Sequence, residues 1–265
     1  MNAMYRFCLM TALCSGVMGA TLPITTWAQE TAPAPVPEVA PAASADAQGA
    51  VAERLNIVPV FTIVSADGSP ILANVEQEGR TMQVASFWLD KAQADQAVES
   101  VRTSNPDIGS SAQVVPVPLG EAFQVAEQQM SQRDDIIFQV VARDSDLQAA
   151  LQVARAAGQT DLTQFPGVPL FYGLSDQGYL TLESEGVEVV PFFFAQQDLD
   201  RVLQQGAQTD PSITTATRIE VTTLELVVDS MLEDPSSDAG KIIFVPTRES
   251  IQFIQSQSPD AFNLE

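Results

Sequence analysis

The sequence predicts an α+β protein made of two similar, internally duplicated α/β halves that are related by pseudo-symmetry. Hydrophobic residues alternate with polar ones in some segments, as in strands, and recur every three or four positions in others, as in helices. The order of these segments repeats about 105 to 110 residues further along the chain. Each half is therefore expected to have a strand meander followed by a helix-strand-helix-strand-helix order.

The N-terminal region has the form of an export signal. Arg6 supplies a short positive start, the apolar run Phe7–Leu22 follows, and Ala28 is a small residue of the kind that a signal peptidase requires. Glycines, a serine and a cysteine interrupt the apolar run, which falls short of the roughly 20 residues that a spanning helix needs. We therefore expect residues 1–28 to be a cleaved signal peptide rather than a membrane anchor.

The segment that follows is rich in proline and alanine. It has no periodic apolar face, so residues 29–52 are expected to form a linker. The first half is then expected to span residues 53–162 and the second half residues 163–258. Residues 259–265 are expected to be a short tail.

Short motifs recur in the same order in the two halves. Val58–Phe61 returns as Val168–Phe171, and each copy is followed by a turn signal that contains glycine. Further along, Ile136–Val140 returns as Ile242–Pro246. Two more matches lie between these and preserve the order. Such a series predicts a duplication of the whole unit rather than a chance repeat.

The elements of the first half follow from local patterns. β-Branched and aromatic residues predict three strands, and Asp67-Gly68 supplies the turn after the first of them. Asp90 is the expected N-cap of the helix that follows, which ends at Asn105. Apolar stripes then predict a strand, a helix, another strand and a last helix that ends at Gly158. The expected strands are 58–64, 71–75, 82–88, 113–117 and 136–141.

The elements of the second half repeat this order. A helix that ends before Gly206 matches the first long helix of the other half. The next helix is expected to begin with a capping box, in which Glu225 lies three residues after Thr222. A strand at 242–245 and a helix through Ile254 complete the second half.

The residue types present exclude most catalytic chemistry. The chain has no histidine, and both cysteines, Cys8 and Cys14, lie inside the predicted signal peptide. Ser-His-Asp and Cys-His catalysis and imidazole or thiolate metal sites are therefore excluded from the mature chain. No glycine-rich nucleotide loop or EF-hand pattern is present. We expect no enzyme activity, no cofactor and no metal.

The acidic residues require a separate explanation. With 34 acidic residues in the chain, close pairs arise by chance, and several stand at helix starts where they complement the helix dipole. A carboxylate-only hydrolase or a structural Ca²⁺ site remains as an alternative. The formal charge of −22 repels phosphate backbones and anionic lipid, so we expect neither nucleic-acid binding nor stable membrane insertion. The close pairs are Asp134-Asp135, Asp144/Asp146, Glu183/Glu185 and Asp198/Asp200.

An aromatic run in each half suggests a contact surface. Val189–Phe194 in the second half is matched by Val84–Leu89 in the first. Neighbouring side chains on a strand point to opposite faces, so one face of each run is core and the other needs a cover. Helices can supply that cover, or the face can be an open apolar groove, for example at Phe87 or Phe193, that meets an extended client chain. The residues predicted to bind clients are Phe87, Trp88, Phe171, Phe192, Phe193 and Phe194.

The second half also carries motifs that resemble a known family. The chain resembles the Tic22 family, which comprises a soluble intermembrane-space subunit of the chloroplast import machinery and its cyanobacterial relatives. The resemblance spans about residues 53–258 and is strongest in the second half. The motifs are Gly167–Tyr172, Gly178–Thr181, Val190–Phe194 with Asp198-Leu199, and Ile242–Ser250.

This resemblance implies a butterfly-like pair of pseudo-symmetric halves with apolar pockets and a non-enzymatic, chaperone-like role. Cyanobacterial relatives are associated with outer-membrane biogenesis in the periplasm, and some also with thylakoids. The N-terminus departs from the chloroplast members, because it is short and resembles a bacterial export signal rather than a transit peptide. The expected compartment is therefore the periplasm, with the thylakoid lumen as the second choice.

The leading functional hypothesis is a factor that holds unfolded or transiting outer-membrane proteins through apolar pockets. The outer-membrane assembly machinery is a further expected partner. The alternative is a periplasmic carrier of a small molecule or lipid, in which the same aromatic residues line a closed pocket.

Overall fold

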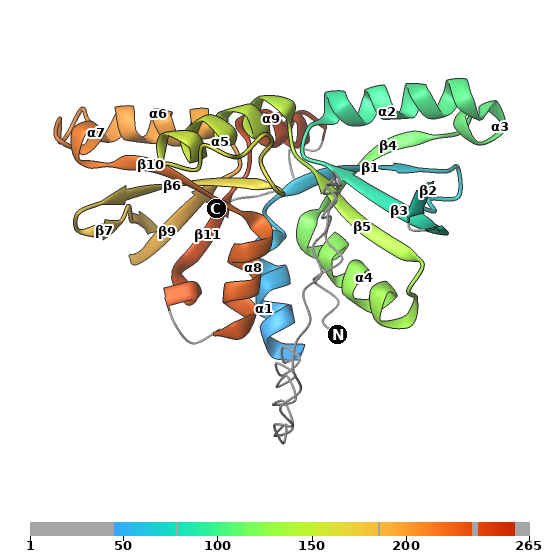
Figure 1. Cartoon of the computed structure of the whole chain (residues 1–265), viewed down its shortest axis with the longest axis horizontal. Coiled ribbons are helices and arrows are strands. Elements are labelled where there is room, and N and C mark those ends of the chain that lie inside the picture. The colour runs from blue at the N-terminus through green and yellow to red at the C-terminus, as the bar shows by residue number, and fades with distance from the viewer. Residues whose placement is uncertain (1–44, 78, 185, 235–237, 258–265) are drawn as a thin grey trace, which may run out of the picture.

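The computed structural model describes residues 45–77, 79–184, 186–234 and 238–257. The predicted signal peptide, the linker as far as residue 44 and the predicted tail lie outside the described residues. The described chain forms two β-sheets side by side, with helices above and below them (Figure 1). This arrangement agrees with the predicted α+β class.

The first sheet contains the strands of the first half. Its order is β2-β3-β1-β4, and β5 pairs with β3. β3 runs antiparallel to β1 and β2 and parallel to β5, while β1 and β4 are antiparallel. The strands are β1 (Pro59–Val64), β2 (Ala73–Gln77), β3 (Arg80–Trp88), β4 (Gln113–Pro118) and β5 (Ile136–Val141).

The second sheet repeats the order and directions of strands β4-β1-β3-β5 of the first sheet. Its order is β10-β6-β9-β11, in which β9 and β11 are parallel and the other neighbours antiparallel. Phe171 pairs with Phe193 as Phe61 pairs with Trp88 in the first sheet. The strands are β6 (Pro169–Ser175), β7 (Gly178–Tyr179), β8 (Leu182–Ser184), β9 (Val187–Phe193), β10 (Arg218–Thr223) and β11 (Ile242–Val245).

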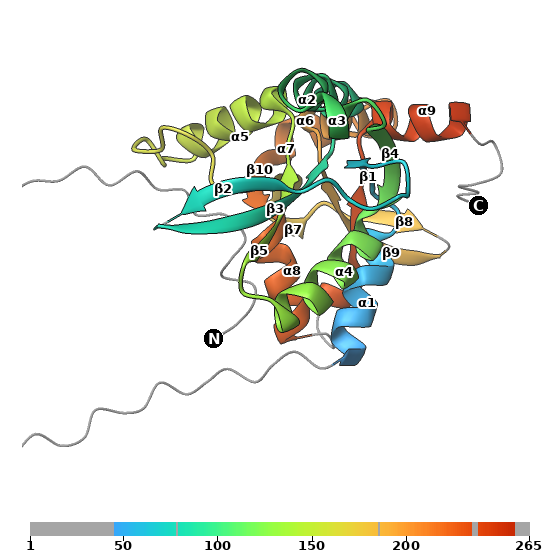
Figure 2. The same ribbon diagram turned by 90° about the vertical axis from the view of Figure 1, so that its right-hand side faces the viewer.

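The helices form one layer above the sheets and one below. α2, α5, α6 and α9 lie above, and α1, α4 and α8 lie below, as Figures 1 and 2 both show. The helices are α1 (Ala45–Leu55), α2 (Lys91–Ser104), α3 (Pro106–Gly109), α4 (Leu119–Gln132), α5 (Asp144–Ala156), α6 (Gln196–Gly206), α7 (Ile213–Ala216), α8 (Leu224–Glu233) and α9 (Arg248–Gln257), with a 3-10 turn at Asp238–Lys241. No helix within the described ranges is long and apolar enough to cross a membrane.

The structure confirms one predicted helix cap and corrects another. Asp90 caps α2, because its carboxylate accepts a hydrogen bond from Ala92 N at 2.7 Å. α8 is capped by Thr223, not by Thr222 as predicted, and the Thr223 hydroxyl accepts from Leu226 N. Glu225 does not close a capping box, because its carboxylate reaches the backbone N–H of Val168 instead.

The main hydrophobic core lies between the sheets and the lower helices. It joins apolar side chains from the lower faces of both sheets, such as Phe138 and Phe244, to those of α1, α4 and α8. Two smaller clusters fill the space above the sheets. One surrounds Phe171 and Phe193, and the other surrounds Ile63. The halves therefore share one core rather than having two independent ones.

The last helix of each half packs on the other half. α5 follows β5 of the first sheet, yet its Ala150 is buried with Phe171 and Phe193 of the second sheet. α9 follows β11 of the second sheet, yet the Phe253 ring lies edge-on to Phe61 of the first, with centroids 5.3 Å apart. Neither predicted half is therefore a self-contained unit.

Helix α1 corrects the predicted linker. The sequence assigned residues as far as 52 to a linker, but residues 45–55 form a helix. Its face of Ala47, Val51, Ala52 and Leu55 is buried, and the last three belong to the main core. The apolar residues of this segment have helical spacing, but several of them are alanines, which contribute little hydrophobicity. The helical pattern was therefore missed in a segment that is rich in alanine and proline.

Candidate functional site

The six aromatic residues predicted to bind clients are mostly in the core. Phe87, Phe171, Phe192, Phe193 and Phe194 are buried, and Trp88 is half-buried. Phe193 is 1% exposed and packs with Leu199 and Leu203 of α6, beneath helix α5 from the first half. Of the two alternatives that the sequence left open at Phe193, the structure therefore shows a cover of helices and no open groove.

An apolar cavity does lie where the two halves meet. Its volume is about 50 Å³, and Phe87 is the one predicted site residue that lines it. Its lining comes mainly from α4, α8 and β5, and is completed by Phe87 of β3 and Leu55 of α1. The lining residues are Leu55, Phe87, Leu119, Ala122, Phe123, Ala126, Phe138, Val140, Leu224, Glu225 and Val228.

The two helices that form this cavity are anchored in the same way. Leu119, the first residue of α4, donates its N–H to Val58 O at 2.8 Å. Leu224, the first residue of α8, donates to Val168 O at the same distance. Each helix thus leaves its sheet beside the start of the first strand of its half. The apolar stripes of α4 and α8 were predicted to cover a sheet. The sequence did not predict that these two helices, from different halves, would line one cavity.

Glu225 is the charged residue of the lining. Its two carboxylate oxygens both accept from Val168 N, at 3.4 Å each. Gly167 has φ of +98°, and a Cβ there would lie 2.7 Å from Glu225 Oε2, so glycine is needed for this close approach. Burial raises the pKa of the Glu225 carboxyl. The cavity is therefore apolar with one carboxylate at its wall.

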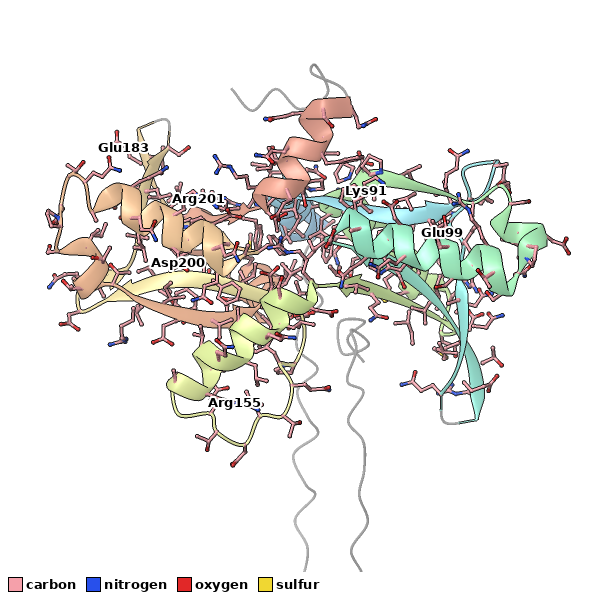
Figure 3. All side chains as sticks on the ribbon, turned by 90° about the horizontal axis from the view of Figure 1, so that it is seen from above. Lys91, Glu99, Arg155, Glu183, Asp200 and Arg201 are labelled. Carbon is pink, nitrogen blue, oxygen red and sulfur yellow. The ribbon has the colours of Figure 1, made fainter. Side chains whose placement is uncertain are left out.

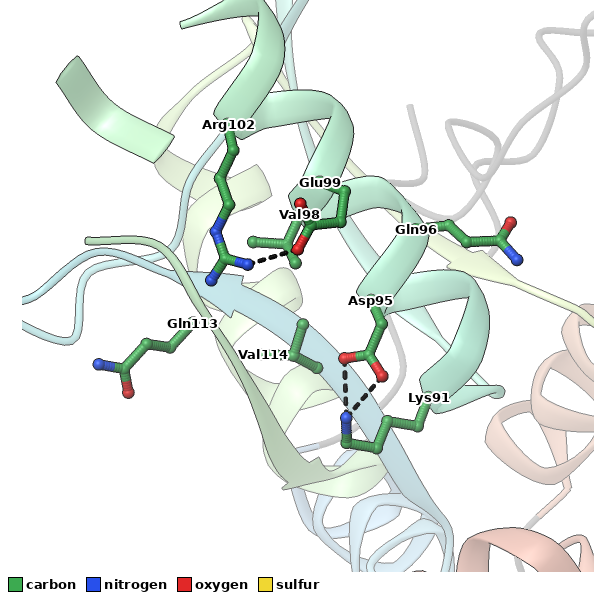
Figure 4. A pocket seen from close by; sticks show the side chains of 8 residues that line it. All are labelled: Lys91, Asp95, Gln96, Val98, Glu99, Arg102, Gln113 and Val114. Carbon is green, nitrogen blue, oxygen red and sulfur yellow. Dashed lines mark hydrogen bonds and ion pairs between the residues drawn. The ribbon is translucent and has the colours of Figure 1, made fainter. Parts of the chain in front are cut away.

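A larger, polar groove of about 570 Å³ lies between α2 and β4 (Figure 4). The charged side chains along it are paired, because Lys91 binds Asp95 at 2.7 Å and Arg102 binds Glu99 at 2.5 Å. β4 is an edge strand that contains Pro116 and Pro118, which have no N–H to donate to an added strand. The groove therefore presents neither an unpaired charge nor a strand edge with a full set of N–H donors to a ligand.

A third cavity, of about 340 Å³, lies where α2, α5 and α9 meet. Arg143 from the first half donates to Asp146 and to Glu249 of the second half. Burial is the main cause that raises the pKa of Asp146, although Arg143 opposes it. These contacts join the start of α5, from the first half, to α9, from the second.

Members of three of the acidic pairs are used in helix starts or ion pairs. Asp198 binds Arg201 at 2.5 Å and accepts from Arg248 N, while Asp135 binds Arg133 at 2.8 Å. Figure 3 shows the upper face from above, with Asp200 and Arg201 on α6 and Lys91 and Glu99 on α2. In residues 45–77, 79–184, 186–234 and 238–257, no group of three or more ligand residues could hold a metal ion.

Comparison with protein families covers nearly the whole chain. The model of the Tic22-like family matches residues 14–256. The chain belongs to the Tic22-like family. The resemblance stated from the sequence motifs is thus confirmed. No curated protein sequence matches the chain.

Two solved structures of Tic22 proteins share the fold over about four-fifths of this chain. Anabaena Tic22, described as a protein of protein transport, matches with a TM-score of 0.68 and 22% identity, over 79% of this chain and 96% of its own. Tic22 from Plasmodium falciparum matches with a TM-score of 0.63 and 19% identity, over 80% of this chain and 99% of its own. At this identity the likeness establishes the fold.

Proposed function

We propose that this Tic22-like protein is a non-enzymatic, chaperone-like factor that holds unfolded outer-membrane proteins during transport. The observation that carries the proposal is the apolar cavity between α4, α8 and the first sheet. Apolar surface at such a site suits contact with exposed apolar segments of a client. The charge of −22 would keep a complex with such a client in solution. A role in transport is also consistent with Anabaena Tic22, which is described as a protein of protein transport.

The proposed compartment is the periplasm, with the thylakoid lumen as the alternative. Support comes from the N-terminal sequence, where Arg6, the apolar run Phe7–Leu22 and Ala28 have the order of an export signal. We propose outer-membrane assembly machinery as a further partner, since a factor that delivers barrel proteins must release them to it.

The alternative function, a carrier of a small molecule or lipid, has weaker support. Drug-sized ligands occupy pockets of roughly 300 to 1,000 Å³. The apolar cavity has about 50 Å³, which accommodates one or two small side chains rather than an enclosed ligand. The larger cavities of 570 Å³ and 340 Å³ have paired charges in their walls. The geometry favours contact with part of a polypeptide.

We also infer that the two halves arose by duplication and are arranged like the wings of a butterfly. Both sheets have the same order of parallel and antiparallel neighbours. The lower helices α4 and α8 begin with equivalent hydrogen bonds to Val58 O and Val168 O. Shared topology and shared local bonding support this origin.

The functional proposal is tested by suppression of client aggregation. A urea-unfolded outer-membrane barrel protein is diluted into buffer with the purified protein and no ATP, and light scattering is recorded. Ala122→Leu places extra methyl groups in the cavity, so we expect it to reduce protection several-fold. Val125→Ser alters a 48% exposed residue of the same helix and should protect as the wild type does.

Circular dichroism melting of both variants establishes that each is folded at the assay temperature. Equal protection by the two folded variants would exclude the cavity as the client site. Absence of protection by the wild-type protein would exclude the holding function itself.

A further inference from the structure

Helix α1 occupies a defined seat beneath the second sheet. It packs on α4, α8 and β11, and the Arg54 guanidinium donates to Ile242 O and Gly240 O, both at 2.6 Å. The seat requires a small residue on α4, because a Cβ at Gly120 would lie 1.9 Å from Ala52 O. The apolar face of α1 consists of two alanines, a valine and a leucine.

The apolar cavity is the counterpart of this seat in the other half. The two sheets share one topology, in which α4 corresponds to α8 and β11 to β5. α1 packs on α4, α8 and β11. If each of these is replaced by its counterpart in the other half, the equivalent position is formed by α8, α4 and β5. Those three elements supply most of the cavity lining, and Phe138 and Val140 are the contributions of β5. In the described ranges, no second α1-like helix fills this position.

Glu225 marks the one clear difference between the two seats. Gly120 and Glu225 are each the second residue of helices that begin with the same backbone bond. Gly120 admits the backbone of α1, whereas Glu225 places a carboxylate at the cavity wall, where both of its oxygens accept from Val168 N at 3.4 Å. A half-buried carboxylate of this kind gains most from a cationic partner, since ionic hydrogen bonds are stronger in a partly desolvated site.

We propose that the cavity is the docking seat for an amphipathic helix of a client protein. The helix lies across α8 as α1 lies across α4, inserts alanine- or valine-sized side chains, and pairs an arginine or lysine with Glu225. A volume of about 50 Å³ suits such side chains and not an aromatic one. This inference rests on the proposed holding function and specifies the class of client segment.

The probe for this inference is a peptide of residues 45–57, which contains the whole of α1 and its arginine. The peptide is acetylated, amidated and labelled, and its binding to the purified protein is followed by fluorescence anisotropy. A second peptide carries Ala52→Pro, which breaks a helix at its centre. We expect the proline peptide to bind at least tenfold more weakly.

Variants of the protein locate the binding. Glu225→Lys should weaken binding about tenfold by repelling Arg54 of the peptide, and Ala122→Leu should weaken it by filling the cavity. Val125→Ser should leave binding unchanged. Peptides with a photoreactive benzophenone should crosslink to Phe123, Phe138 or Val140. Crosslinks confined to Ile242 would show that the peptide replaces α1 in its own seat, and would overturn the inference.

The outcomes separate this inference from the proposed function. If Ala122→Leu abolishes client protection but the proline peptide binds as well as the helical one, the holding function stands and the helical seat is wrong. If the helical peptide binds at the cavity but Ala122→Leu leaves client protection intact, the seat stands and the cavity is not where clients are held. Equal binding of the peptide to Glu225→Lys and to the wild type would overturn the charge pairing.

Discussion

Replacing Phe193 with alanine tests whether the aromatic strand is core or contact surface. Phe193 is 1% exposed, and its ring lies between the second sheet and the helices α5 and α6. Removing a fully buried phenylalanine ring costs about 3 to 5 kcal/mol, because burial is lost and a cavity remains. That is a large part of the roughly 5 to 15 kcal/mol that stabilises a typical domain.

The assay is urea denaturation followed by circular dichroism, together with thermal melting. For a chain of this size, each kcal/mol shifts the melting temperature by about 2 to 4 °C, so a decrease of roughly 6 to 20 °C is expected. Tyr179→Ala is the matched control, since Tyr179 is an aromatic residue of the same sheet that is 55% exposed. Its cost should be about 1 kcal/mol, the order expected for lost contacts with neighbouring rings.

A cost below about 1 kcal/mol for Phe193→Ala would refute the argument, because a residue in a packed core cannot be removed so cheaply. It would indicate that α5 leaves the sheet readily and uncovers an aromatic face. Client protection measured in the folded range should be the same for Phe193→Ala and the wild type. Loss of protection by the folded variant would restore the aromatic strand as a contact surface.

Two further predictions concern pH and processing. Burial raises the folded-state pKa of Glu225 above its ordinary value of 4.5, so the folded state binds this proton more tightly than the unfolded state. The Glu225 contribution should therefore become more favourable as the pH falls from neutral towards 4.5, and Glu225→Gln should be more stable than the wild type at pH 7, with a difference that shrinks over that window. Denaturation curves at several pH values check this, and a difference that grows on acidification would contradict it. For processing, mass spectrometry of the exported protein should show Gln29 as the first residue, and retention of residues 1–28 would disprove the signal peptide.

Much of the local structure follows from the sequence because it depends on short-range chemistry. Asp90 caps α2 as predicted, since its carboxylate needs only the N–H two residues further along. The prediction that failed at α8 shows the limit of this reasoning. Thr222 and Thr223 are both good caps, and which one is used depends on Val168, 57 residues away in the chain, which engages the Glu225 carboxylate.

The candidate site was only partly predictable. Aromatic residues were chosen because of their type and position, and Phe87 does line the cavity. Phe171 and Phe193 do not, because α5 crosses from the other half and covers them. Phe123 and Phe138 were placed on a helix and a strand by their periodicity, but no local signal indicates that their elements meet α8.

By itself the sequence determined the order of strands and helices, the repeat of that order and the exclusion of histidine chemistry. Periodicity and residue type are properties of neighbouring residues, so they can be read along one chain. The tertiary structure decided which half each closing helix covers, that α1 folds against the core, and that one seat is filled while its counterpart holds a cavity. Those outcomes depend on the fit of surfaces far apart in sequence, such as Gly120 beneath Ala52 and Glu225 beside Gly167. Such fit is a matter of packing in three dimensions, where a single Cβ decides whether a helix can approach.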